Sequence, residues 1–151
     1  MFDIIFLDID GVLRTHQSDL EWSEKLNTPI FKKTDRLFSK KSVNNINYIT
    51  SLTRAKIVVT SSWRLHLSVV ELNSLFRKRG IHTEIIGKTE IGLNRGEEIQ
   101  TWLDENDHVT NYVVIDDQTN DIINTIPKNK VIKVDPKIGF DNIDGVLDIL
   151  L

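Results

Sequence analysis

The chain has no cysteine among its 151 residues, and it has only three prolines, one methionine and 7% aromatic residues. Without cysteine it forms no disulfide, uses no thiolate nucleophile and holds no zinc through sulfur. No apolar run approaches the roughly 20 residues that a membrane-spanning helix requires. The apolar run at the amino terminus is too short and too acidic for a signal peptide. This composition fits a cytoplasmic protein, and that is the location we expect.

No charge of one sign dominates, because 19 basic residues face 22 acidic ones and the net charge is −3. The chain as a whole is therefore not drawn to nucleic acid. Its hydrophobic content of 40% is ordinary for a soluble domain. Its length suits one domain with a substantial core, which we expect to span residues 1–151. Basic residues still crowd one short stretch, which contains Lys32, Lys33, Arg36, Lys40 and Lys41.

Apolar runs rich in Val and Ile alternate with amphipathic patterns, which predicts strands that alternate with helices. The predicted strands cover residues 2–8, 56–60, 81–86, 111–116 and 130–134. The predicted helices cover residues 42–53, 68–79, 95–105 and 142–151, with at most a short helix over 119–124. This order indicates an α/β fold: a Rossmann-like, doubly wound parallel sheet of about five strands with helices on both faces.

Two carboxylates one residue apart, Asp8 and Asp10, close the first strand, and Gly11 follows directly. Alternate side chains of a strand share a face, so both can point into one site. Neighbouring carboxylates repel at neutral pH unless a cation or a proton lies between them, and oxygen ligands favour Mg²⁺. Two solvated aspartates in a turn are the alternative. An EF-hand loop is excluded because the glycine comes too early.

Polar residues also follow the other strands, where ligands bind in sheets of this kind. They are Thr60, Ser61, Ser62, Trp63 and Arg64 after the second strand, Asp116 and Asp117 after the fourth, and Arg95 at the start of the preceding helix. Phosphoryl transfer needs such a set, because cations and hydroxyls bind the phosphate oxygens and a carboxylate can attack phosphorus.

With these motifs the chain resembles the haloacid dehalogenase superfamily, most of whose members are Mg²⁺-dependent phosphatases. The first motif, Asp-x-Asp-Gly before a hydrophobic residue, matches residues 8–12. The second, an apolar strand that ends in Thr or Ser, matches residues 59–60, and the fourth, an acidic pair, matches residues 116–117. Residues 60–64 and 95–99 are similar to small domains of this superfamily that are associated with nucleic-acid repair proteins.

The resemblance implies a reaction through an aspartyl phosphate. Asp8 would be the nucleophile, Asp10 would act first as general acid and then as general base, and Thr60 would bind phosphoryl oxygens. The metal ligands would be Asp8, Asp10 through its backbone carbonyl, and Asp116.

Two assignments stay open at this stage. Asp117 would be a further metal ligand or would orient a cation, and Asp121 could take its place. The cation of the third motif is Arg95, which begins a helix and has a planar fork for phosphate oxygens, or Lys88, since the family uses Lys more often.

Candidates for substrate binding are Gly11, Ser61, Arg64 and Lys88. Trp63 is expected to pack beneath its loop, and stacking on a base is the alternative.

No insertion has room for a large cap domain, although residues 14–38 could hold a hairpin flap. Without a large cap domain the site is open to solvent, which suits a large substrate. We therefore expect the substrate to be a polynucleotide end, with a nucleotide as the second choice. The phosphates of such a substrate would be attracted by Lys32, Lys33, Lys40 and Lys41.

Two rival functions remain. One is a non-catalytic phosphate-binding module. The other is a phosphoacceptor receiver, which would need an aspartate where residues 85–87 read Ile-Ile-Gly.

Overall fold

The computed structural model covers the chain and describes all residues except 27–36. Five parallel strands form one sheet in the order β3-β2-β1-β4-β5. The strands are β1 (Phe2–Leu7), β2 (Lys56–Val59), β3 (Ile85–Lys88), β4 (Val109–Asp116) and β5 (Val131–Lys133). The winding reverses at β1, so the crevice between the ends of β1 and β4 is where a ligand is expected in this architecture.

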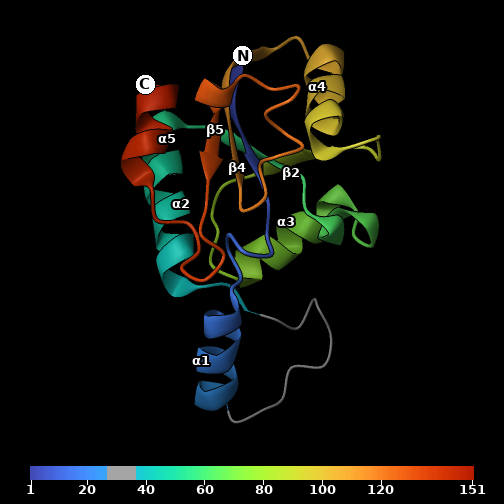
Figure 1. Cartoon of the computed structure of the whole chain (residues 1–151). Helices are drawn as coiled ribbons and strands as arrows, with labels where there is room; N and C mark the ends of the chain where they lie inside the picture. The colour runs from blue at the N-terminus through green and yellow to red at the C-terminus, as the bar shows by residue number, and fades with distance from the viewer. Residues whose placement is uncertain (27–36) are drawn as a thin grey trace.

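Helices cover both faces of the sheet, as predicted (Figure 1). Residues of α2 (Lys40–Thr53), α3 (Val69–Lys78) and α5 (Ile143–Leu150) pack on one face. Residues of α4 (Arg95–Glu105) and the turns after β4 pack on the other. The described residues also form two short 3₁₀ helices, η2 (Ser62–Leu65) and η3 (Lys128–Lys130). The α/β fold with a doubly wound parallel sheet is therefore confirmed.

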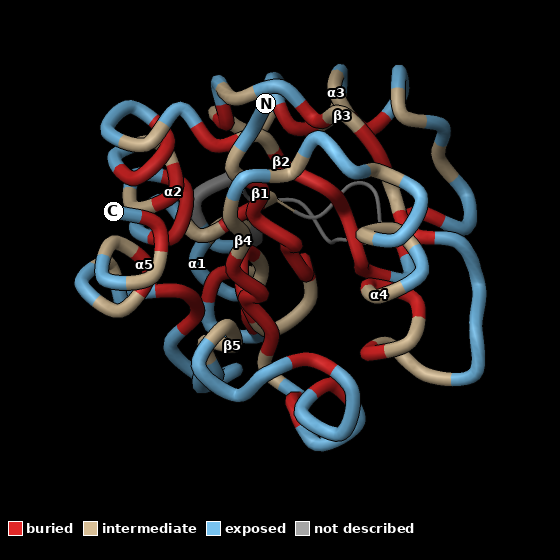
Figure 2. Tube along the Cα trace, turned by 90° about the horizontal axis from the view of Figure 1, so that it is seen from above, coloured by how far each residue is buried: buried red, intermediate tan, exposed pale blue. Residues whose placement is uncertain are grey.

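The central strands of the sheet are buried (Figure 2), and their side chains are apolar on both faces. In β1, Ile5 and Leu7 join the core beneath α2, α3 and α5, whereas Ile4 and Phe6 join the core beneath α4. This alternation is the two-residue period of a strand that is covered on both faces. Packing on both faces fixes the position of the carboxyl end of β1 and therefore of the residues that follow it.

The third strand lies later in the chain than predicted. Residues 81–86 were expected to be strand, but β3 runs over Ile85–Lys88. The amide of Asn47 donates to the Gly80 carbonyl and accepts from the His82 N–H, and the Ile81 N–H bonds back to the end of α3. These bonds use the backbone groups that a strand would need, so the apolar pattern alone misplaces the strand.

The stretch 14–38 also differs from the prediction. Residues His16–Leu26 form the helix α1, where a hairpin flap was expected, and α1 projects from the carboxyl edge of the sheet (Figure 1). Thr15 and Ser18 bond reciprocally at its start, which satisfies two backbone N–H groups there. The predicted contributions of Lys32, Lys33 and Arg36 lie outside the described residues. Among the residues that the structure describes, no helix is long and apolar enough to cross a membrane.

Candidate active site

Three carboxylates meet at the carboxyl edge of the two central strands. Asp8 follows β1, Asp116 ends β4 and Asp117 comes next, and one oxygen of each lies within 4.8 Å of the others. Pairing of the two strands brings them together, because the Asp8 N–H donates to the Ile115 carbonyl at 3.2 Å. Asp8 and Asp116 are buried, so water screens the repulsion between their charges only weakly.

Arg95, the first residue of α4, lies against this group. Its Nη1 is 2.7 Å from Asp116 Oδ2 and 3.5 Å from Asp8 Oδ2. Burial raises the pKa of Asp8 well above its ordinary value and the Asp116 charge adds to this, while Arg95 opposes it. Burial also raises the pKa of Asp116, again against the effect of Arg95. One guanidinium therefore offsets only part of the negative charge.

The residues present fit a divalent cation. Three carboxylates against one guanidinium leave a surplus of negative charge, and oxygen donors at such mutual distances are the ligands that Mg²⁺ prefers. The carboxylate of Asp10 is not part of this group, and Asp121 lines the same cavity without joining it. Of the two candidates left open by the sequence, Asp117 is thus the one beside Asp8 and Asp116.

Asp10 points to different partners. Its Oδ1 accepts from Arg14 Nη1 at 3.2 Å, and both of its carboxylate oxygens lie 3.2 Å from the indole Nε1 of Trp63. Arg14 is in turn held by Asp19 of α1. Trp63 is buried, as expected from its packing, but its bond to Asp10 was not predicted.

Arg64, a predicted substrate-binding residue, is turned into the protein. It donates to the backbone carbonyls of Thr60, Ser61 and Thr89, and its Nη2 lies 2.8 Å from Glu98 Oε2. Its side chain is 6% exposed. This guanidinium holds the loop after β2 in place, and Glu98, which sequence reasoning missed, is its counter-charge.

Thr60 and Gly11 lie where the motifs require them. The Thr60 N–H donates to the Leu7 carbonyl, next to Asp8, and its buried hydroxyl has no hydrogen-bond partner among the described residues. Gly11 has φ +83°, and a Cβ there would lie 2.5 Å from Asp117 Oδ2. Only glycine allows the loop and the carboxylate to approach so closely. The Ser61 hydroxyl accepts from the Trp63 N–H and so caps η2.

Lys88 does not reach the carboxylates. It lies in β3, not in the loop after it, and its Nζ donates to the carbonyls of Arg64 and Leu67 at 3.0 Å. Between the two candidates for the third-motif cation, the structure brings Arg95 to the site and keeps Lys88 away from it.

A cavity of about 1160 Å³ opens onto Asp8 and Asp10. The exposed apolar side chains of Leu65 and Ile91 line part of it. Its lining also includes Lys133 and Lys137, two exposed residues whose side-chain ammonium groups make no hydrogen bond or ion pair with any described residue. Neither lysine was predicted from the sequence, although Lys133 ends a strand and could have been found by the same rule as Asp116.

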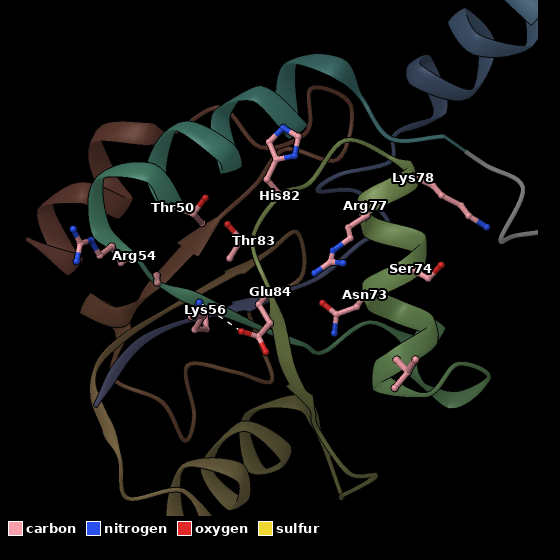
Figure 3. Close-up of a pocket in the computed structure, with 12 residues that line it drawn as sticks. Thr50, Arg54, Lys56, Asn73, Ser74, Arg77, Lys78, His82, Thr83 and Glu84 are labelled. Carbon is pink, nitrogen blue, oxygen red and sulfur yellow. Dashed lines mark ion pairs between the residues drawn. The ribbon is translucent and has the colours of Figure 1, made fainter.

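The basic hollow in Figure 3 lies elsewhere, at the amino ends of β2 and β3. It has a volume of about 880 Å³ and is lined by Arg54, Lys56, Arg77 and Lys78. Glu84 is the one carboxylate among its described lining residues, and it pairs with Lys56 at 3.6 Å. A single carboxylate that is already paired with a lysine cannot do the chemistry of the three carboxylates at the opposite edge of the sheet.

The family model described as the HAD domain in Swiss Army Knife RNA repair proteins matches residues 4–145. The chain belongs to this family. HAD denotes haloacid dehalogenase, so the resemblance seen in the motifs is confirmed. A haloacid dehalogenase-like family hydrolase from Streptococcus pneumoniae has a similar structure, with a TM-score of 0.51, 11% sequence identity, and coverage of 99% of this chain and 90% of that chain. A search of curated proteins gave no match.

In this HAD domain the motifs converge as the family pattern predicts. The first motif follows β1, the second ends β2 and the fourth ends β4, all at one edge of the sheet. The loop that follows β3 begins at Thr89, which is no phosphoacceptor aspartate, and the receiver alternative finds no support. Asp8, Asp116, Asp117, Arg95 and Asp10 therefore form the candidate active site.

Proposed function

We propose that this HAD domain is a Mg²⁺-dependent phosphomonoester hydrolase that works through an aspartyl phosphate. The observation that supports this most directly is the group of three carboxylates at the ends of β1 and β4, with Arg95 between two of them. Such a group is costly to bury unless it serves a cation and a phosphate. The similar solved structure is described as a hydrolase, which agrees with the proposal.

The reaction has two steps. A carboxylate oxygen of Asp8 attacks phosphorus, the ester P–O bond breaks, and the leaving oxygen takes a proton from the Asp10 carboxyl. A water molecule then gives a proton back to Asp10 and attacks the phosphorus of the aspartyl phosphate. This releases inorganic phosphate and restores Asp8.

The remaining residues bind charge. Bound Mg²⁺, held by Asp8, Asp116 and Asp117, would supply charge neutralisation that lets the carboxylate approach the phosphate. Arg95 contacts Asp8 and Asp116 through Nη1, so its other N–H groups can donate to a phosphoryl oxygen. The unpartnered hydroxyl of Thr60 can donate to another.

The substrate that we propose is a phosphorylated polynucleotide end, with a nucleotide as the alternative. Lys133 and Lys137 supply unpaired positive charge in the cavity wall, where a second phosphate of a strand can bind. Leu65 and Ile91 offer an apolar surface for a base. The family's association with RNA repair proteins supports the same substrate class.

Phosphate release from phosphorylated sugars, peptides, nucleotides and oligonucleotides tests the activity. We expect release with Mg²⁺ and none with a chelator. Asp8→Asn should lower kcat by about 10⁴-fold or more, because an amide cannot form the acyl phosphate. Asp107→Asn, at a fully solvated position, is the matched control. Full activity of Asp8→Asn, or of the wild type in chelator, would remove the proposal.

The substrate class needs a separate test. The double variant Lys133→Ala/Lys137→Ala should lose the preference for an oligonucleotide over its mononucleotide, and added salt should have the same effect on the wild type. Lys78→Ala/Lys128→Ala changes charge equally, outside the cavity, and is the control. Lys40 and Lys41, which the sequence suggested, line a neighbouring hollow that shares Lys137. Equal kcat/KM for both substrates in the wild type would favour a small metabolite.

A further inference from the structure

We propose that Trp63 and Arg14 are positioning residues that orient the carboxylate of Asp10 for proton transfer, and that Asp19 of α1 fixes Arg14. The proposal rests on the proposed function, in which Asp10 is the acid and the base. It assigns a task to a tryptophan in the loop after β2 and to the helix α1, neither of which belongs to the motifs.

Trp63 holds Asp10 from the core side. Its side chain is 1% exposed and packs among the apolar residues beneath α2 and α3, with its ring 6.1 Å from that of Phe38. An indole N–H can only donate, and a buried one is costly without an acceptor. The Asp10 carboxylate is this acceptor, at 3.2 Å to both oxygens. A rigid ring thus fixes where the carboxylate lies.

Arg14, four residues after Asp10, also holds its carboxylate. Its Nε lies 3.1 Å from Asp19 Oδ1, and its Nη2 bonds to Asp19 Oδ2, so one carboxylate grips the guanidinium fork at two points. Nη1 then reaches Asp10 Oδ1 at 3.2 Å. The backbone adds a bond from the Gly11 N–H to the Arg14 carbonyl at 2.7 Å. The position of Arg14 is therefore set by α1 and by the tight turn after Asp10.

Asp10 needs this support because its side chain is 36% exposed. A carboxylate at a cavity wall can otherwise rotate into water, whereas proton transfer needs it within hydrogen-bond reach of the leaving oxygen. A displacement of about 1 Å can cost about 100-fold in rate. The two donors leave the carboxylate in the wall of the cavity, where the substrate oxygen would lie.

The test compares two leaving groups. Trp63→Phe keeps an aromatic ring in the core and removes the N–H. Trp102→Phe makes the same change on the opposite face of the sheet, where Trp102 packs against Phe6. Single-turnover reactions with enzyme in excess report the first chemical step, in which Asp10 donates its proton. A nucleoside 3′-phosphate needs that proton, while 4-nitrophenyl phosphate has a leaving group that departs without it.

We expect Trp63→Phe to slow the first step on the nucleoside phosphate by about 10- to 100-fold, with little change on 4-nitrophenyl phosphate or in substrate affinity. Trp102→Phe should change neither substrate. In an Asp10→Asn background Trp63→Phe should have no further effect, since the residue it positions is gone. Asp19→Asn should give the same selectivity at about tenfold or less, because it removes the charge of Asp19 and one of its two hydrogen bonds to Arg14 while the other can remain.

Equal losses on the two substrates, or no loss on either, would overturn the positioning role in a folded Trp63→Phe protein. If Trp63→Phe does not fold, the selectivity of Asp19→Asn decides, because that side chain lies on α1 outside the core. Failure of the proposed function looks different: the wild type would then hydrolyse neither substrate.

Discussion

The ion pair between Arg64 and Glu98 gives the most direct test of what holds the site together. Nη2 of Arg64 lies 2.8 Å from Glu98 Oε2, and the two side chains are 6% and 10% exposed. The same oxygen accepts from the Gly92 N–H at 2.9 Å. Glu98→Gln keeps the shape of the side chain but removes its charge. Arg64 is then left charged and buried among backbone carbonyls.

Removing one partner of a buried ion pair costs about 3–5 kcal/mol. In a domain of this size each kcal/mol corresponds to about 2–4 °C in Tm, so Glu98→Gln should lower Tm by about 6–20 °C. Removing both charges, as in Arg64→Met/Glu98→Leu, should cost less than the sum of the two single changes. It will not be neutral, because the carbonyls of Thr60, Ser61 and Thr89 lose their donor.

Thermal and urea unfolding of the wild type, Glu98→Gln, Arg64→Met, Glu98→Leu and the double variant measure these values. Glu97→Gln, at the preceding residue of α4, is the control. It should lower the free energy of unfolding by no more than about 1 kcal/mol, through a weaker interaction with the helix dipole. A loss below 1 kcal/mol for Glu98→Gln would refute the reasoning, and so would strict additivity of the two single changes.

Other outcomes concern the carboxylates and the turn beside them. Burial and the Asp116 charge raise the pKa of Asp8, so the folded protein binds a proton there more tightly than the unfolded chain, and stability falls as pH rises from the ordinary carboxyl range through the raised pKa. Asp8→Asn should therefore raise the Tm at pH 7 in chelator, with a gain over the wild type that shrinks towards pH 4. Mg²⁺ at 100 times its Kd should stabilise the wild type by about 2.7 kcal/mol, and Asp116→Asn should lose most of this shift in a thermal melt. Gly11→Ala, strained at φ +83° and in contact with Asp117, should cost about 1–3 kcal/mol by urea unfolding and lower kcat.

Much of the fold could be predicted from the alternation of apolar runs and helical patterns. The helix over 95–105 begins and ends as expected, because Asn94 caps its start and two glutamates lie in its first turn. The start of β3 could not be predicted, since Asn47 of α2 and Asn73 of α3 bind the backbone around it. Contacts of this kind join segments that no local pattern connects.

The site shows the same division. Asp8, Asp116 and Asp117 could be found because each follows an apolar strand, and the ends of parallel strands meet. The inward turn of Arg64 and the bond from Trp63 to Asp10 could not, because both depend on how the loop after β2 folds back. The helix α1 was missed since its sequence has little apolar periodicity, although the reciprocal bonds of Thr15 and Ser18 define its start.

The side chain of Asn73 affects whether the sheet of this molecule can pair, edge to edge, with the sheet of another copy. Its amide donates to the Ile85 carbonyl and accepts from the Ile85 N–H, as a further strand would do at the outer edge of β3. The opposite edge, β5, is only three residues long and ends in Lys133. Exposed strand edges are where sheets of separate molecules join, and short, charged or occupied edges prevent it. The two borders of this sheet thus give a neighbouring chain little backbone on which to add a strand.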